Sequence, residues 1–416
     1  MNDPANEGNP LQGLLGDLLK VIGSAQSAGG SPWLDAARAL AQGVATDGAP
    51  EANTDPLRRI ELEELARVAE LHVADATGLP LAAQGHRAPV LVPVTRGIWA
   101  LRLLEAWRPL VGKLVDAQGG APGMPAGMLG GMLGDEEAGV LGDILGKFAA
   151  TMGPVLLGMQ LGSAAGHLAK RALGQYALPL PWPESPELLI VPDNVAAFAE
   201  DWSLPIDETR LWVCVRELTT HAVMQRPQVD ARLRELIEAA TDQALAAQQG
   251  IGDRLGIMPG DPESLQNLLS DPESLMADLL TPDRRATSSR LTALTTAIAA
   301  YVDHVTARVA SSLTGSASSL AEAWHRHRVQ DSTGEQAAGA LFGLDLGGDE
   351  VERGAAFVRG VVDRAGEEGL DLLWTEPRNL PTPAEVDAPG LWLERISLPG
   401  DGEPGGKLPE GGPSDG

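Results

Sequence analysis

The chain has 416 residues, and 57 acidic against 31 basic side chains give it a formal net charge of −26 at pH 7. A surface this acidic repels nucleic-acid phosphates and anionic membranes, which excludes nucleic acid as an expected partner. Hydrophobic residues make up 44% of the chain but aromatic residues only 4%. The apolar residues are mainly Ala, Leu and Val, a mixture that favours helices over strands and predicts a mainly α fold with a sizeable core.

Two further features concern the cellular location. The only cysteine is Cys214, so no intramolecular disulfide can form. The first ten residues, MNDPANEGNP, are polar and acidic and lack the pattern of a secretory signal. Both features predict a cytoplasmic protein.

The most apolar stretch of the chain is Met152–Leu168, in which glycine recurs every four residues at 158, 162 and 166. In a lipid bilayer such a face pairs transmembrane helices, whereas in a soluble protein it lets two helices approach closely. Polar residues interrupt the stretch, and it is barely long enough to span a membrane. We therefore expect no membrane span.

Helical periodicity and turn residues divide the first part of the chain. Residues 1–30 are expected to hold a short amphipathic helix at 11–23 and a linker. A domain is expected over residues 31–396. The elements predicted within its first part are helices at Pro32–Gly43, Pro56–Thr77 (with Asp55 as N-cap) and Trp99–Val111, and a short strand at Val90–Pro93.

The rest of the chain alternates low-complexity and helical segments. Residues 118–134 are rich in Gly and Met and are predicted to form a flexible insertion, and residues 397–416 a disordered acidic Gly/Pro tail. Two copies of DPESL, at 261–265 and 271–275, predict two short capped helices. Further predicted elements are a strand at Leu188–Val191 and helices at Val195–Glu200, from about Pro205 to Pro227, starting at Thr281-Pro282-Asp283, at Ser288–Ser312 and at 350–370.

The stretch LWVCVRELTTHAVMQRP (211–227) contains R-E-L-T-T-H, which is close to a zinc-protease helix. In the motif H-E-x-x-H, two histidines one turn apart bind zinc, and the glutamate activates the metal-bound water. Here Glu217 is in place, but the two ligand positions hold Arg216 and Thr220. Because arginine cannot lose its proton and a threonine hydroxyl is a poor zinc ligand, the standard pair of ligands is absent.

Neighbouring segments extend the likeness beyond the motif. Residues 157–181, 188–223, 299–309 and 352–396 resemble a family of zincin-like metallopeptidases typical of high-GC Gram-positive bacteria, whose members are provisionally named hydrolases or zinc-dependent metalloproteases. The resemblance covers most of the chain between Ser31 and Ile396. It implies a mainly α-helical zincin-like metallopeptidase fold with a minor β element.

Members of this family with an intact site read H-E-L-T-H-H. The resemblance implies that the two metal histidines fall on Arg216 and Thr220, and the catalytic general base on Glu217. It further implies that a third ligand, a glutamate on a downstream helix, falls on Ala299. With all three ligand positions changed, the chain is expected to be a catalytically degenerate member that binds no metal or other cofactor.

Two interpretations of the remaining polar residues stay open. Glu217 and His221 are one helical turn apart, and with Asp303 and His304 they could form a shifted zinc site of mixed oxygen and nitrogen ligands. Alternatively, Arg216 fills the former metal position and pairs with Glu217 or Asp303, which would hold two helices together.

A second group of histidines lies in the segment WHRHR at 324–328. His325 and His327 alternate with arginines there. We predict a solvated, basic end of a helix at this place rather than a metal site.

Three functional hypotheses follow. The leading one is a degenerate zincin-like metallopeptidase that acts as a binding or scaffold protein for a protein or peptide partner. The alternative is an active zinc-dependent hydrolase that uses a shifted site around Glu217 and His221. A third is a purely structural subunit that assembles through its N-terminal helix and its glycine-rich helix.

Overall fold

The computed structural model describes residues 31–82, 88–119, 135–257, 281–330, 333–345 and 347–398. The predicted helix at 11–23, most of the Gly/Met-rich insertion, both DPESL segments and the acidic tail from 399 onward lie outside these residues.

Helices dominate the described structure, which confirms the predicted mainly α class. They are α2 (Pro32–Ala45), α3 (Pro56–Thr77), α4 (Arg96–Gly119), α6 (Asp135–Ala169), α7 (Pro192–Asp201), α8 (Ile206–Met224), α9 (Pro227–Ile257), α12 (Pro282–Leu313), α13 (Ala317–Val329), α14 (Thr333–Phe342), α15 (Gly348–Asp371), α16 (Pro383–Asp387) and α17 (Pro389–Ser397). Two short 3-10 helices, η1 (Leu372–Trp374) and η2 (Pro377–Asn379), join α15 to α16.

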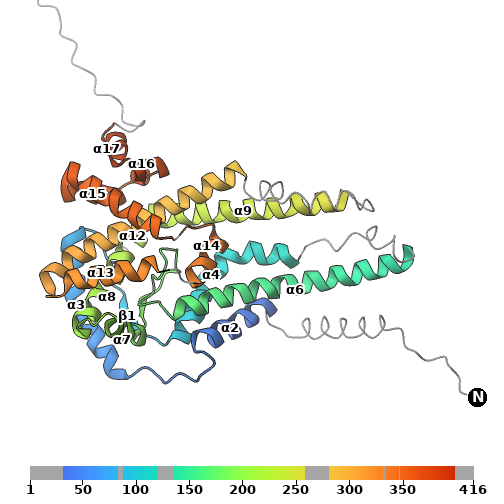
Figure 1. Ribbon diagram of the computed structural model, residues 1–416, viewed down its shortest axis with the longest axis horizontal. Helices are drawn as coiled ribbons and strands as arrows, with labels where there is room; N and C mark the ends of the chain where they lie inside the picture. The colour runs from blue at the N-terminus through green and yellow to red at the C-terminus, as the bar shows by residue number, and fades with distance from the viewer. Residues whose placement is uncertain are drawn as a thin grey trace, which may run out of the picture.

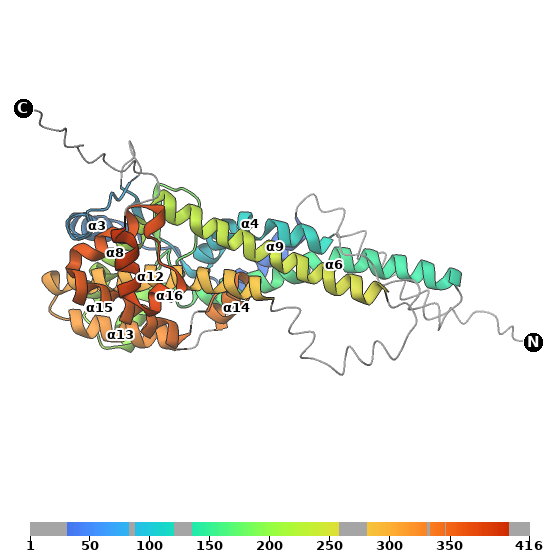
Figure 2. The ribbon, with the colours of Figure 1, turned by 90° about the horizontal axis from the view of Figure 1, so that it is seen from above.

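The molecule is elongated. Figure 1 and Figure 2 both show α6 and α9 running along the long axis and projecting from a broad end formed by α3, α7, α8, α12, α13 and α15. The remaining C-terminal helices, α16 and α17, pack on α15. The candidate motif on α8 therefore lies in the thick, many-layered end of the molecule.

A minor β element completes the fold. The strands β1 (Val90–Pro93) and β2 (Glu187–Ile190) form a two-stranded parallel sheet in which Val90 pairs with Glu187. The predicted second strand is thus displaced by one residue toward the N-terminus. Val191, expected in the strand, instead occupies the N-cap position of α7, because Pro192 supplies the preformed first residue of that helix.

Helix boundaries follow the capping residues. The Asp55 side chain accepts a hydrogen bond from the Leu57 N–H at 3.0 Å, and α3 ends at Gly78, whose φ of 62° is left-handed. Both ends of this helix agree with the prediction. The helix predicted to start at Thr281-Pro282-Asp283 and the long one predicted at Ser288–Ser312 form one continuous helix from Pro282, and the Thr281 hydroxyl caps it by accepting from Arg284 N–H.

The glycine-rich face of α6 packs on α2. A β-carbon at Gly158 would lie 2.1 Å from the Trp33 carbonyl oxygen, and one at Gly162 would lie 2.3 Å from that of Ala37. The glycines therefore let two backbones come into direct contact, which is the packing role that the spacing allowed. Within the residues that the structure describes, no helix is apolar over a length that would cross a membrane.

This contact yields a prediction about stability. Replacing Gly162 by Ala should lower the free energy of unfolding by about 1 to 3 kcal/mol, because the new methyl group forces α2 and α6 apart. Gly112→Ala on α4 is the matched control, since no described atom lies within 4 Å of its β-carbon position. Urea unfolding would compare the two, and equal stabilities would contradict the close packing of α2 on α6.

Candidate functional site

The helix α8 carries the motif into the core of the molecule. Every residue from Trp212 to Met224 is buried, since α8 is packed against α3, α7, α9 and α12. A helix buried on all sides must satisfy its polar side chains within the protein. The contacts of Arg216, Glu217, Thr220 and His221 therefore define what this site can do.

Glu217 is held by the segment that follows α6. Its Oε2 accepts a hydrogen bond from the Tyr176 N–H at 2.9 Å, and its Oε1 lies 3.3 Å from Nη1 of Arg216. Burial raises the pKa of this carboxyl, and the Arg216 charge and the Tyr176 N–H oppose that rise. A β-carbon at Gly174 would lie 2.4 Å from the Glu217 Cδ, so only glycine fits beside the carboxylate.

The segment that contacts Glu217 is fixed by its neighbours. Trp99 Nε1 donates to the Gly174 carbonyl at 2.9 Å, and the Val191 N–H donates to the Leu173 carbonyl at 3.0 Å. The Asn194 amide donates to two carbonyls at the end of α6. The sheet and α7 thereby position the loop against the motif.

Arg216 occupies a nearly dry position. Its side chain is 9% exposed, and its guanidinium carbon lies 4.2 Å from the centroid of the Trp324 ring. Such a cation–π contact is worth about 2 kcal/mol when desolvated. Burial lowers the pKa of Arg216, while nearby Asp303 and Glu217 raise it, and an arginine stays charged in any case. Its Nε is buried without a hydrogen-bond partner among the described residues.

The other two changed ligand positions, Thr220 and Ala299, have different surroundings. The Thr220 hydroxyl donates to the Arg216 carbonyl of its own helix at 2.8 Å, so it turns back on the backbone. Ala299 on α12 lines the same cavity as Arg216 and Glu217. The structure therefore brings the third implied position to the first, across the gap between α8 and α12.

His221 contacts Tyr176, the residue that also contacts Glu217. Its Nδ1 lies 3.1 Å from the Tyr176 hydroxyl, which donates to it when the imidazole is neutral. Burial lowers the pKa of His221 to about 4, so the ring is neutral near pH 7. Burial also raises the pKa of the Tyr176 phenol, which remains a donor.

Asp303 and His304 face different parts of the protein. Asp303 accepts from Trp324 Nε1 at 2.9 Å and forms an ion pair with Arg328. His304 Nε2 lies 2.9 Å from Glu367 on α15. Within the residues that the structure describes, no three His, Cys, Asp or Glu side chains are grouped as they would be around a metal ion.

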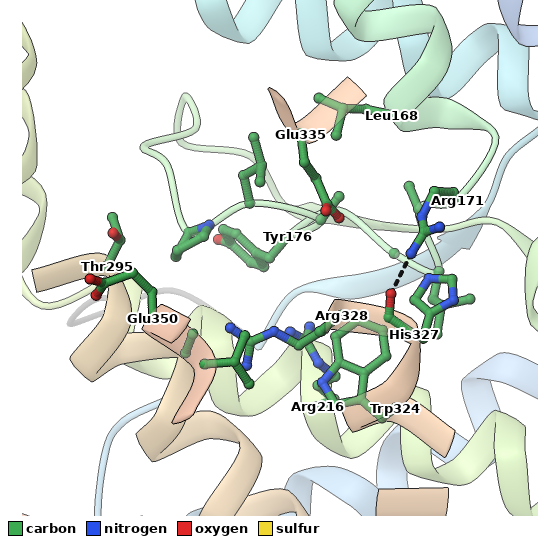
Figure 3. A pocket seen from close by; sticks show the side chains of 18 of the residues that line it. Leu168, Arg171, Tyr176, Arg216, Thr295, Trp324, His327, Arg328, Glu335 and Glu350 are labelled. Atoms are coloured by element: carbon green, nitrogen blue, oxygen red, sulfur yellow. Dashed lines mark hydrogen bonds between the residues drawn. The ribbon is translucent and has the colours of Figure 1, made fainter. Parts of the chain in front are cut away.

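A cavity that is open to solvent lies in front of Arg216 and Glu217. The loop after α6, α8, α12, α13 and the region around α14 and the start of α15 provide its walls. Figure 3 shows Arg216, Arg328 and Trp324 gathered on one side, with Arg171 and His327 next to them. Thr295 and Glu350 lie on the other side of the view.

Sequence reasoning missed the part that α13 plays in this cavity. WHRHR was predicted to be a solvated end of a helix, but His327 is only partly exposed and stacks on Trp324, with ring centroids 5.5 Å apart. Burial, with Arg171 and Arg216 nearby, lowers the pKa of His327 to about 4. His325, which pairs with Glu352 at 3.3 Å, and Arg326, which pairs with Glu322, lie toward solvent as expected. The helical spacing of Trp324, His327 and Arg328 could have indicated a shared face.

The neutral His221 makes stability depend on pH. Below the usual histidine pKa of 6.5, this side chain is protonated in the unfolded chain. In the folded chain it stays neutral until about pH 4. As the pH is lowered through this window, we expect the free energy of unfolding to decrease by up to about 1.4 kcal/mol per pH unit from this group. Urea titrations should show a shallower pH slope for His221→Gln, which cannot titrate. Identical slopes for the two proteins would contradict a buried neutral imidazole.

The chain is similar to known proteins over most of its length. The family model of the zincin-like metallopeptidases matches residues 33–393. A crystal structure from Chloroflexus aurantiacus, provisionally described as a hydrolase with a novel fold, superposes with a TM-score of 0.60. The two sequences are 24% identical. The match covers 88% of this chain and 99% of the other chain, which supports a common fold. None of the curated proteins matches the chain. The match over most of its length shows that this chain belongs to the zincin-like metallopeptidase family.

Proposed function

We propose that this chain is a degenerate zincin-like metallopeptidase that binds a protein or peptide partner through the former catalytic cleft. The observation that supports this most directly is the buried contact between Arg216 and Glu217 at 3.3 Å. A permanent cation at the position that the resemblance gives to the first zinc ligand supports a degenerate site. Glu217 is thereby engaged as an ion-pair partner instead of a free general base.

The residues at the three ligand positions do not fit a zinc ion. Arg216 offers only N–H donors, the Thr220 hydroxyl is directed to its own helix, and Ala299 has a methyl group. Zinc needs lone pairs from nitrogen, sulfur or oxygen in tetrahedral positions. The chemistry of a metal-activated water is therefore not assigned to this cleft.

The alternative, a working hydrolase with a shifted metal site, has less support. Glu217 and His221 share Tyr176 as a partner, but Asp303 and His304 pair with residues of two other helices. Gathering all four side chains around one ion would break each of these contacts. The rotation of one residue along α8 also directs His221 toward Tyr176, which is buried.

The cytoplasmic location is part of the same proposal. Cys214 is a free and fully buried thiol, and burial raises its pKa to about 12. Such a thiol is an inert core residue and needs no oxidising compartment.

Metal analysis tests the proposal. The purified wild-type chain should hold no stoichiometric zinc, whereas Arg216→His, Thr220→His and Ala299→Glu together should bind about one zinc ion per chain. The same three positions changed to Gln are the matched control and should bind none. Stoichiometric zinc in the wild type that is lost in Glu217→Gln or His221→Ala would instead establish the shifted site.

A further inference from the structure

The cavity has one strongly cationic wall. Arg171, Arg216 and Arg328 all line it, together with Trp324. Figure 3 shows Arg216 and Arg328 beside the indole ring, and Arg171 further away next to His327. Arg328 is held by Asp303, and Arg171 donates to the His327 carbonyl.

These arginines have donors to spare. The Nε atoms of Arg171 and Arg216 are both buried and without a hydrogen-bond partner among the described residues. A guanidinium group has five N–H donors, and the contact of Arg216 with Glu217 uses one of them at a long 3.3 Å. Leaving a buried donor unsatisfied is costly, so this wall is poised to accept an anion.

The rest of the cavity limits the charge of that anion. Glu217 lies at the base of the wall, and Glu335, Asp345 and Glu350 line other parts of the cavity. A dianion such as phosphate would meet repulsion from these carboxylates. A single carboxylate on a partly apolar body suits the site better, since Ala299 and Val351 also line it.

We propose that the cavity binds an organic carboxylate, with the carboxylate at Arg216 beside Trp324. This inference rests on the proposed function, because it places the ligand's anion where an intact family member would hold its metal. The ligand is either a small carboxylic acid or a peptide that ends in a free carboxylate. The two share the same chemistry at Arg216, and the test distinguishes them.

Calorimetric titration tests this with two acids, 3-phenylpropanoate and N-acetyl-alanyl-phenylalanine, each compared with its neutral amide. At least one acid should bind, and about tenfold or more tightly than its amide, because a charged hydrogen bond is lost in the amide. Arg216→Gln should reduce binding of that acid to the level of the amide. Arg210→Gln, a part-buried arginine that lines another cavity, should leave the affinity unchanged.

Ala299→Leu gives a second variant that fills the cavity without removing a charge, and it should also abolish binding. Equal binding of acid and amide, no binding of either acid, or full affinity in Arg216→Gln would overturn the proposal. Zinc is measured on the same samples. If the protein is zinc-free and binds neither acid, the carboxylate proposal fails but the proposed degenerate site does not. Stoichiometric zinc in the wild type would instead contradict the proposed function.

Discussion

The buried ion pair between Arg216 and Glu217 constrains everything around the candidate site. Two charges removed from water are tolerated only if further contacts compensate each of them. The Tyr176 N–H serves the carboxylate at 2.9 Å, and the Trp324 ring serves the guanidinium group at 4.2 Å. The first contact requires the loop after α6, and the second requires α13. The pair thus connects three segments that are far apart in sequence, much as a shared ligand would.

The surrounding architecture can be understood as support for this pair. Trp99 and the sheet hold the loop in which Gly174 leaves space for the Glu217 side chain. Asp303 on α12 receives both Trp324 and Arg328 of α13, so the ring beneath Arg216 is fixed in place. The compensation is incomplete, because the buried Nε of Arg216 has no hydrogen-bond partner among the described residues. The residue with this shortfall, Arg216, is also one that lines the cavity.

Much of the fold could be predicted from local signals, whereas the site could be predicted only in part. Proline and capping residues placed both ends of α3, and glycine spacing indicated the close packing of α6. The resemblance to the family brought Arg216, Glu217 and Ala299 together, and the structure places all three at one cavity. The roles of Tyr176 and Trp324 could not be predicted, because each depends on a contact across more than 40 or 100 residues. His327 was misplaced in part for the same reason, since its contact with Phe198 is a tertiary one, whereas its contact with Trp324 follows from helical spacing.

An arginine at this position also fixes the electrostatics of the cleft over a wide pH range. Its guanidinium group stays protonated in proteins, while burial keeps both His221 and His327 neutral down to about pH 4. The positive charge at this wall therefore comes from arginines alone, and it does not vary near neutrality. A general base needs a carboxylate that is free to take a proton from its substrate or from water. Glu217 is instead held by Arg216 and by the Tyr176 N–H, and this restraint supports the proposal that the cleft recognises an anion.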